Sequence, residues 1–322
     1  MQNRNTQSLG ASTSKSKEVP MWSYFLLILP PLFWAGNSVL ARGIATLIPP
    51  VTMSFWRWFL ALAILLPFTW RQTYRDLPLI KQHWKIILAL GTFGIASFNT
   101  LLYTAAHTTT ALNIALTQSV MPVVIVMISF IFYRERITAL QFGSIVLCML
   151  GAGYIVIRGD WQRLAHLQFV SGDLLMLLAV VLYALYSVLL RQRPPIHQLS
   201  FLTATFSVGV VLLLPVYIWE MQQVPLPQLT QPIVISLTYL ALLPSIASYL
   251  LWNKGVHQIG ANRAGLFINL IPLFASVLAV LFLHEKFQLY HTVGIILITT
   301  GLVSFNLLAW RKKTLTNRNN KR

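Results

Sequence analysis

Ten apolar runs, each of roughly 20 residues, divide this 322-residue chain. A helix of that length is what the hydrocarbon core of a bilayer requires, because its backbone groups must all be hydrogen-bonded internally. Proline pairs such as Pro49-Pro50 and Pro194-Pro195 mark breaks between runs, since proline cannot continue a helix. The sequence therefore predicts an all-α integral membrane protein with ten transmembrane helices at about 22–41, 51–70, 85–106, 109–133, 139–157, 172–190, 199–218, 233–252, 262–283 and 289–310.

Charged side chains make up only 10% of the chain, against about 25% in soluble domains. The net charge of +17 would also suit a nucleic-acid partner, but the charges fall in short clusters between apolar runs. If the N-terminus is cytoplasmic, most of the 24 Lys and Arg residues fall on the inner side. We therefore expect both termini in the cytoplasm, no nucleic-acid partner, a disordered tail over 1–20 and a basic tail over 311–322.

The two halves of the chain resemble each other at an offset close to 150 residues. Because each half holds five predicted helices, an odd number, the second copy would enter the membrane from the opposite face. This predicts two inverted five-helix repeats, 21–158 and 172–310, around a central cavity, as in many secondary transporters. A duplicated bundle without a transport role is the alternative. The matched pairs include Pro122 with Pro272, Glu135 with Glu285 and Gly151 with Gly301.

Short motifs recur in order along both halves. The first half has Trp34-Ala35-Gly36-Asn37, then Phe55-Trp56-Arg57-Trp58, and ends at Arg134-Glu135-Arg136; the second ends similarly at His284-Glu285-Lys286. From about Tyr24 to Leu308 the chain resembles the EamA family of the drug/metabolite transporter superfamily. The resemblance implies a bacterial inner-membrane carrier for amino acids or other small organic solutes. It does not name the substrate.

Polar side chains within apolar runs are costly in lipid, so they usually face the bundle interior or a wet cavity. Arg57 is a candidate counter-charge for a substrate carboxylate, or else a side chain that snorkels to the surface. The amides could instead join helices by hydrogen bonds, and the aromatics could be packing residues. We predict that Pro122 and Pro272 are hinges or kinks. The predicted cavity-lining residues are Trp34, Asn37, Arg57, Asn99, Tyr103, Gln118, Tyr183, Tyr186, Tyr249 and Asn269.

These features favour a secondary transporter that works by alternating access on a small-molecule substrate, with export more expected than import. No Asp or Glu lies mid-run, so we expect facilitated or potential-driven movement rather than a carboxylate proton relay; Glu135 and Glu285 fit capping or salt-bridge roles. A channel-like facilitator is the main alternative. An intramembrane enzyme is less expected, because neither HExxH nor GxSxG occurs and no catalytic, metal or cofactor site is predicted. Substrate, coupling ion and oligomeric state stay open.

Overall fold

The computed structural model describes residues 22–44, 47–225, 227, 230–282 and 286–319. Within these residues the chain is all-helical, without a strand, and nine helical segments are long and apolar enough to cross a membrane. The tail predicted over 1–20 and the turn at Glu285 lie outside the described residues.

The first half of the chain forms eight α-helices and one π-helical turn. A short helix, α9 (Gln162–Ala165), follows it and leads to the second half. The elements of the first half are α1 (Trp22–Leu26), α2 (Leu29–Gly43), α3 (Pro50–Gln82), α4 (Trp84–Leu90), the π-helical η1 (Gly91–Ser97), α5 (Phe98–Ala106), α6 (Ala111–Ser119), α7 (Met121–Tyr133) and α8 (Ala139–Val156).

The second half repeats this order, and its π-helical turn lies 150 residues after the first one. Its elements are α10 (Ser171–Leu189), the 3₁₀ turn η2 (Leu190–Gln192), α11 (Gln198–Gln223), α12 (Gln231–Leu240), the π-helical η3 (Ala241–Ala247), α13 (Ser248–Ile259), α14 (Ala261–Gly265), the 3₁₀ turn η4 (Leu266–Asn269), α15 (Leu270–Phe282) and α16 (Leu289–Asn319).

Two predicted helices are interrupted near prolines. The run over 22–41 forms α1 and α2 instead of one helix, with a turn at Leu27 and Ile28 directly before Pro30 and Pro31. The run over 109–133 is likewise divided at Val120 into α6 and α7. Proline has no N–H for the helical ladder and fits best in a first turn, so each new helix begins where its prolines are tolerated.

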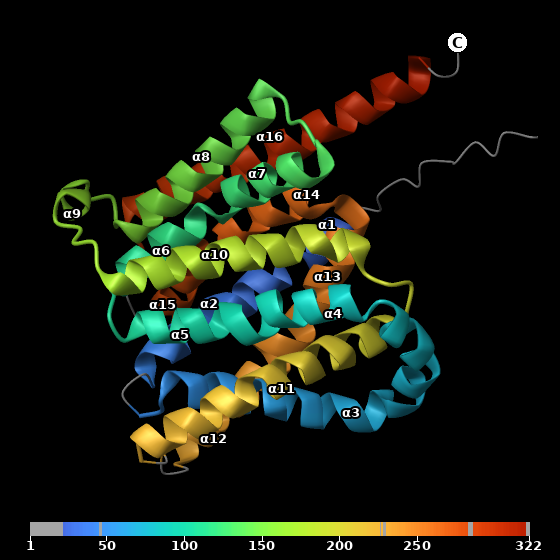
Figure 1. Ribbon diagram of the computed structural model, residues 1–322. Coiled ribbons are helices and arrows are strands. Elements are labelled where there is room, and N and C mark those ends of the chain that lie inside the picture. The colour runs from blue at the N-terminus through green and yellow to red at the C-terminus, as the bar shows by residue number, and fades with distance from the viewer. Residues whose placement is uncertain (1–21, 45–46, 226, 228–229, 283–285, 320–322) are drawn as a thin grey trace, which may run out of the picture.

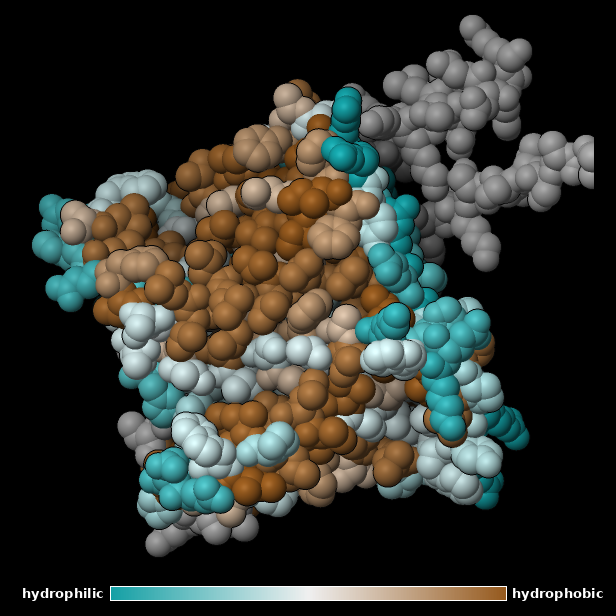
Figure 2. Space-filling model, in the orientation of Figure 1, coloured by the Kyte–Doolittle hydropathy of each residue, from teal (hydrophilic) through white to brown (hydrophobic). Residues whose placement is uncertain are grey.

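The outer surface matches a chain solvated by lipid. Figure 2 shows hydrophobic residues covering the middle of the visible face, with hydrophilic residues gathered toward the two ends of the helices. Large apolar side chains on this surface are widely exposed, including Phe68 at 82% and Leu289 at 77%. In water such a surface would be unusual, whereas in a bilayer it is the expected exterior.

The second long helices of the two halves, α3 and α11, pack side by side (Figure 1). Near the start of α3 and the end of α11, Phe55 stacks on Tyr217 with ring centroids 4.4 Å apart. At the other end of the pair, the Thr69 and Thr203 hydroxyls are hydrogen-bonded at 2.8 Å. Because the early part of one helix meets the late part of the other, these repeat-related helices run antiparallel.

The last helices of the two halves, α8 and α16, also pack together (Figure 1). A Cβ on Gly301 would lie 2.6 Å from Cys148 Sγ, and a Cβ on Gly294 would lie 2.2 Å from Ile155 Cγ1. Glycine therefore lets the two backbones approach closely, as small residues do in membrane helix pairs. Here too the early residue of one helix meets the late residue of the other, so the pair is antiparallel.

Candidate functional site

A narrow cavity lies between the two halves of the bundle, and each half supplies part of its wall. The volume open to the centres of water molecules is about 20 Å³, little more than the roughly 10–15 Å³ that one water needs. The structure is thus a nearly closed form of the site. The lining residues are Trp34, Asn37, Ser38, Phe98, Asn99, Leu102, Gln118 and Met121 from the first half, and Tyr183, Tyr249, Ile268 and Ile271 from the second.

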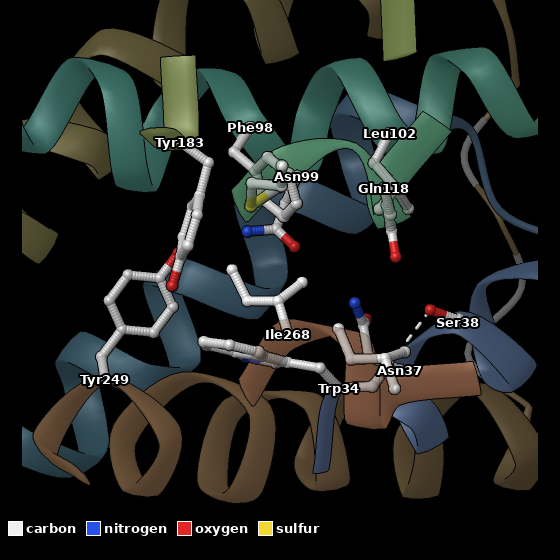
Figure 3. A pocket seen from close by; sticks show the side chains of 12 residues that line it. Trp34, Asn37, Ser38, Phe98, Asn99, Leu102, Gln118, Tyr183, Tyr249 and Ile268 are labelled. Carbon is white, nitrogen blue, oxygen red and sulfur yellow. Dashed lines mark hydrogen bonds between the residues drawn. The ribbon is translucent and has the colours of Figure 1, made fainter. Parts of the chain in front are cut away.

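Six of the ten predicted lining residues meet at this cavity. The amide groups come from three different helices, α2, α5 and α6, and the tyrosines from α10 and α13. Figure 3 shows the polar ends of the labelled amides and of Tyr183 directed into the space between the helices. The six residues are Trp34, Asn37, Asn99, Gln118, Tyr183 and Tyr249.

Arg57 lies behind this wall and is fully buried, at 0% exposure. Its Nε donates to Ser245 Oγ at 2.7 Å, and its Nη2 donates to the Pro244 carbonyl at 3.1 Å. Both acceptors belong to η3 of the second half, while Arg57 belongs to α3 of the first. The snorkelling interpretation is therefore wrong, because the guanidinium is held between the halves.

The remaining donors of Arg57 reach three side chains of its own half. Nη1 donates to Asn99 Oδ1 at 2.6 Å, to the Tyr103 hydroxyl at 2.7 Å and, over a longer distance of 3.3 Å, to Asn37 Oδ1. None of the acceptors observed around this guanidinium is a carboxylate. Among the described contacts, the positive charge of Arg57 is therefore surrounded by neutral acceptors and is not balanced by an ion pair.

The two π-helical turns supply backbone acceptors that sequence reasoning missed. The hydroxyl of Tyr249 donates to the Gly94 carbonyl in η1 at 2.5 Å. At the position 150 residues later, the Pro244 carbonyl in η3 accepts from Trp34 Nε1 at 3.1 Å as well as from Arg57. Each turn thus binds an aromatic side chain of the opposite half, and π-helical insertions often occur at functional sites.

Five other predicted residues lie away from the cavity wall. Tyr103 is part of the Arg57 group just described, whereas Tyr186 donates to Asn253 Oδ1 at 2.6 Å. Asn269 is fully buried, and within the part of the chain that the structure describes neither polar atom of its amide has a hydrogen-bond partner. Pro122 lies in the first turn of α7, and Pro272 lies in α15 just after η4. The structure tests neither proline as a hinge.

Carboxylates lie at helix ends in the described chain. Glu135 pairs with Arg191 and accepts from Asn262 Nδ2 at 3.1 Å, which is the predicted salt-bridge role. Glu220 was not predicted to act; it is buried at the end of α11 and accepts from the backbone N–H groups of Val51 and Thr52 at 3.0 and 2.6 Å. It caps the N-terminus of α3, where a negative charge is favoured.

Comparison with known proteins identifies the family to which this chain belongs. A family model described as the EamA-like transporter family matches residues 21–157 and again 170–307. The chain belongs to the EamA-like transporter family. It is therefore a multi-pass membrane transporter built of two EamA repeats, as its motifs suggested.

Individual relatives of this EamA protein are distant but cover most of its length. It is 24% identical to the uncharacterized transporter YyaM of Bacillus subtilis, over 87% of this chain and 92% of that protein. It is 27% identical to Protein PecM of Dickeya dadantii, over 74% and 80% of the two chains. A solved crystal structure shares the fold with a TM-score of 0.72 at 16% identity, covering 90% of this chain and 98% of that chain.

Proposed function

We propose that this EamA protein is a secondary transporter that exports small organic metabolites, such as amino acids or related compounds, across the bacterial inner membrane by alternating access. The observation that carries the proposal is a narrow cavity whose wall is shared by the two repeats. Rocking one repeat against the other would open such a cavity to either side in turn. The cavity holds little more than one water, which suits an occluded state of a carrier better than a conducting pore.

We further propose that ten segments cross the membrane, with α1 and α2 together forming the first, and that both termini are cytoplasmic. The two repeats would then be inverted, over 21–158 and 172–310. The antiparallel packing of α3 on α11 and of α8 on α16 supports this, because equivalent helices of parallel repeats would run the same way. In this arrangement the six cavity residues contact the substrate, Arg57 and Tyr103 hold two of them in place, and Pro122 and Pro272 are hinges.

The inverted arrangement is tested by the accessibility of two turns. In a Cys148→Ser background, single cysteines replace Arg136 after α7 and Lys286 after α15, and intact cells are treated with a membrane-impermeant thiol reagent. We expect labelling at position 286 alone, because only that turn would face the periplasm. Equal labelling of both positions in intact cells would contradict the inverted repeat.

Transport is tested in cells and in vesicles. Overexpression should protect cells from growth inhibition by toxic amino-acid analogues, and proteoliposomes should show counterflow of the protective compound. Cells without the overexpressed protein and protein-free liposomes serve as the inactive controls. Protection without counterflow would mean that the effect in cells does not arise from this carrier.

A further inference from the structure

The hydrogen bonds around Arg57 fix the orientation of two cavity amides. A guanidinium has only donors, so the atoms that it contacts must be acceptors. Arg57 Nη1 lies 2.6 Å from one side-chain atom of Asn99 and 3.3 Å from one of Asn37. Those two atoms are therefore the amide oxygens, whichever way an amide might otherwise be turned.

Tyr103 provides a second hydrogen bond that fixes the orientation of the Asn37 amide. Its hydroxyl oxygen accepts from Arg57 at 2.7 Å, so its own proton is free to be donated elsewhere. The neighbouring acceptor is Asn37 Oδ1, at 2.8 Å. A directional chain thus runs from the guanidinium through the tyrosine hydroxyl to the amide oxygen, and the Asn37 oxygen receives two donors.

With both oxygens turned to Arg57, the Nδ2 group of Asn37 remains for the cavity that these residues line, whereas the Asn99 amide donates to the Tyr249 hydroxyl. Figure 3 shows the Asn37 nitrogen directed into that space, with Gln118 opposite. The Tyr183 hydroxyl, also on the wall, is buried and has no hydrogen-bond partner among the described residues. A buried polar group without a partner is costly, which is the state expected of a site that awaits a ligand.

The lining itself is uncharged, and the charge described next to it is positive. None of the twelve residues that line the cavity is acidic, and the buried Arg57 charge lies directly behind Asn37 and Asn99. Apart from Ser38 and Gln118, the rest of the wall is apolar or aromatic, as at Phe98, Leu102 and Ile268. A low-dielectric wall with donors and a nearby positive charge stabilises an anion and repels a cation.

We propose that the transported substrate is an anion with a carboxylate-like head group and an apolar body, and that the Nδ2 group of Asn37 and the Tyr183 hydroxyl bind the head group. This rests on the proposed transport function and narrows its substrates from amino acids and related compounds to those that carry a net negative charge. It also gives a direction, because an inside-negative potential drives each exported negative charge outward by about 2.3 kcal/mol per 100 mV. No proton-carrying carboxylate is then required in the cavity.

The test uses one apolar body with three head groups: 3-phenylpropanoate, 3-phenylpropanamide and 3-phenylpropylamine at neutral pH. Binding to the purified full-length protein is measured by quenching of tryptophan fluorescence, to which Trp34 on the cavity wall contributes. We expect the carboxylate to bind about tenfold or more tightly than the amide, and the amine to bind weakest. Equal or tighter binding of the amine, or no binding of any of the three, would overturn the assignment.

A variant and a matched control sharpen this result. Asn37→Asp replaces the cavity-facing donor with an acceptor and places a negative charge beside Arg57, so carboxylate affinity should fall about tenfold or more while amine affinity rises. Gln141→Glu makes the same amide-to-acid change in the capping box of α8, outside the cavity, and should leave both affinities unchanged. Unchanged carboxylate affinity in a folded Asn37→Asp protein would overturn the role of Asn37.

Flux separates this inference from the function on which it rests. In proteoliposomes loaded with 3-phenylpropanoate, an inside-negative potassium diffusion potential should accelerate efflux. Selective carboxylate binding without any flux would leave the anion site standing and would remove the carrier function. Flux of the amine in preference to the carboxylate would support the carrier function and would overturn the anion site.

Discussion

Arg57 and Thr205 occupy matching places in the two halves, because each is the eighth residue of its helix, α3 or α11. They differ in what they bind. Both are buried, at 0% and 1% exposure. Arg57 donates to groups of both halves, whereas the Thr205 hydroxyl donates only to the Phe201 and Leu202 carbonyls of its own helix. One copy thus carries a charge that joins the repeats, and the other carries a hydroxyl satisfied within its own turn.

The difference shows which features the two copies share and which they do not. The π-helical turns lie 150 residues apart, and Gly151 and Gly301 both lie in the α8–α16 contact. These shared features are matters of backbone packing. The charged group has no counterpart, so the cavity is asymmetric although the scaffold around it is duplicated.

The largest effect should come from removing the unmatched charge. Arg57→Ala leaves several buried acceptors without a donor, each at a cost of about 1–3 kcal/mol, so the thermal stability of the detergent-solubilised protein should fall strongly. Thr205→Val, at the matching place, removes only a bond within one helix and should cost less than about 1 kcal/mol. Differential scanning fluorimetry of both variants measures this. Similar losses at the two positions would contradict the asymmetry.

The next effect should appear at the shared glycine contact. Gly301→Leu places side-chain atoms where a Cβ would already meet Cys148 Sγ and the Ser144 carbonyl at 2.6 Å, so it should destabilise by about 1–3 kcal/mol or more. Gly151→Leu should behave alike, since it lies in the same contact. Gly143→Ala is the control, because a Cβ there meets nothing within 4 Å. A tolerated Gly301→Leu would mean that the helices separate without cost.

From the sequence alone, it was easier to predict which polar residues are buried than to predict which of them face the cavity. Asn269 was predicted to line the cavity, but it does not belong to the wall. The chain forms the 3₁₀ turn η4 there, with 3.0 rather than 3.6 residues per turn, and Ile268 and Ile271 face the cavity. Such a change of winding leaves no periodic signal in the sequence.

The partners of Arg57 could be anticipated only in part. Asn37, Asn99 and Tyr103 were predicted to line the same space, and they do meet around the guanidinium. Ser245 and the Pro244 carbonyl were missed, because a π-helical turn looks like an ordinary apolar run. Pro244 within a transmembrane run is the one local signal that the ladder changes there.

A smaller loss of stability should follow when η1 loses its aromatic donor, because the two π-helical turns differ in how many donors they bind. The Gly94 carbonyl accepts from Tyr249, whereas the Pro244 carbonyl accepts from both Trp34 and Arg57. Tyr249→Phe should therefore cost about 0.6–2 kcal/mol, the range for one hydrogen bond between membrane helices. Tyr74→Phe is the control, because that side chain is 74% exposed. The same scanning fluorimetry applies, and equal midpoints would show that η1 does not depend on this donor.

The smallest effect should come from the contact that joins the halves at the surface. Glu135 binds Arg191 and Asn262 of the second half, but the Glu135 and Arg191 side chains are 43% and 59% exposed. Exposed ion pairs contribute about 0–1 kcal/mol and weaken with salt, so Glu135→Gln should barely move the thermal midpoint, and less still at high ionic strength. Because Arg57 joins the same halves where water is excluded, its removal should cost several times more. A loss from Glu135→Gln equal to that from Arg57→Ala would mean that the repeats are held together at the membrane surface and that the buried charge serves the substrate alone.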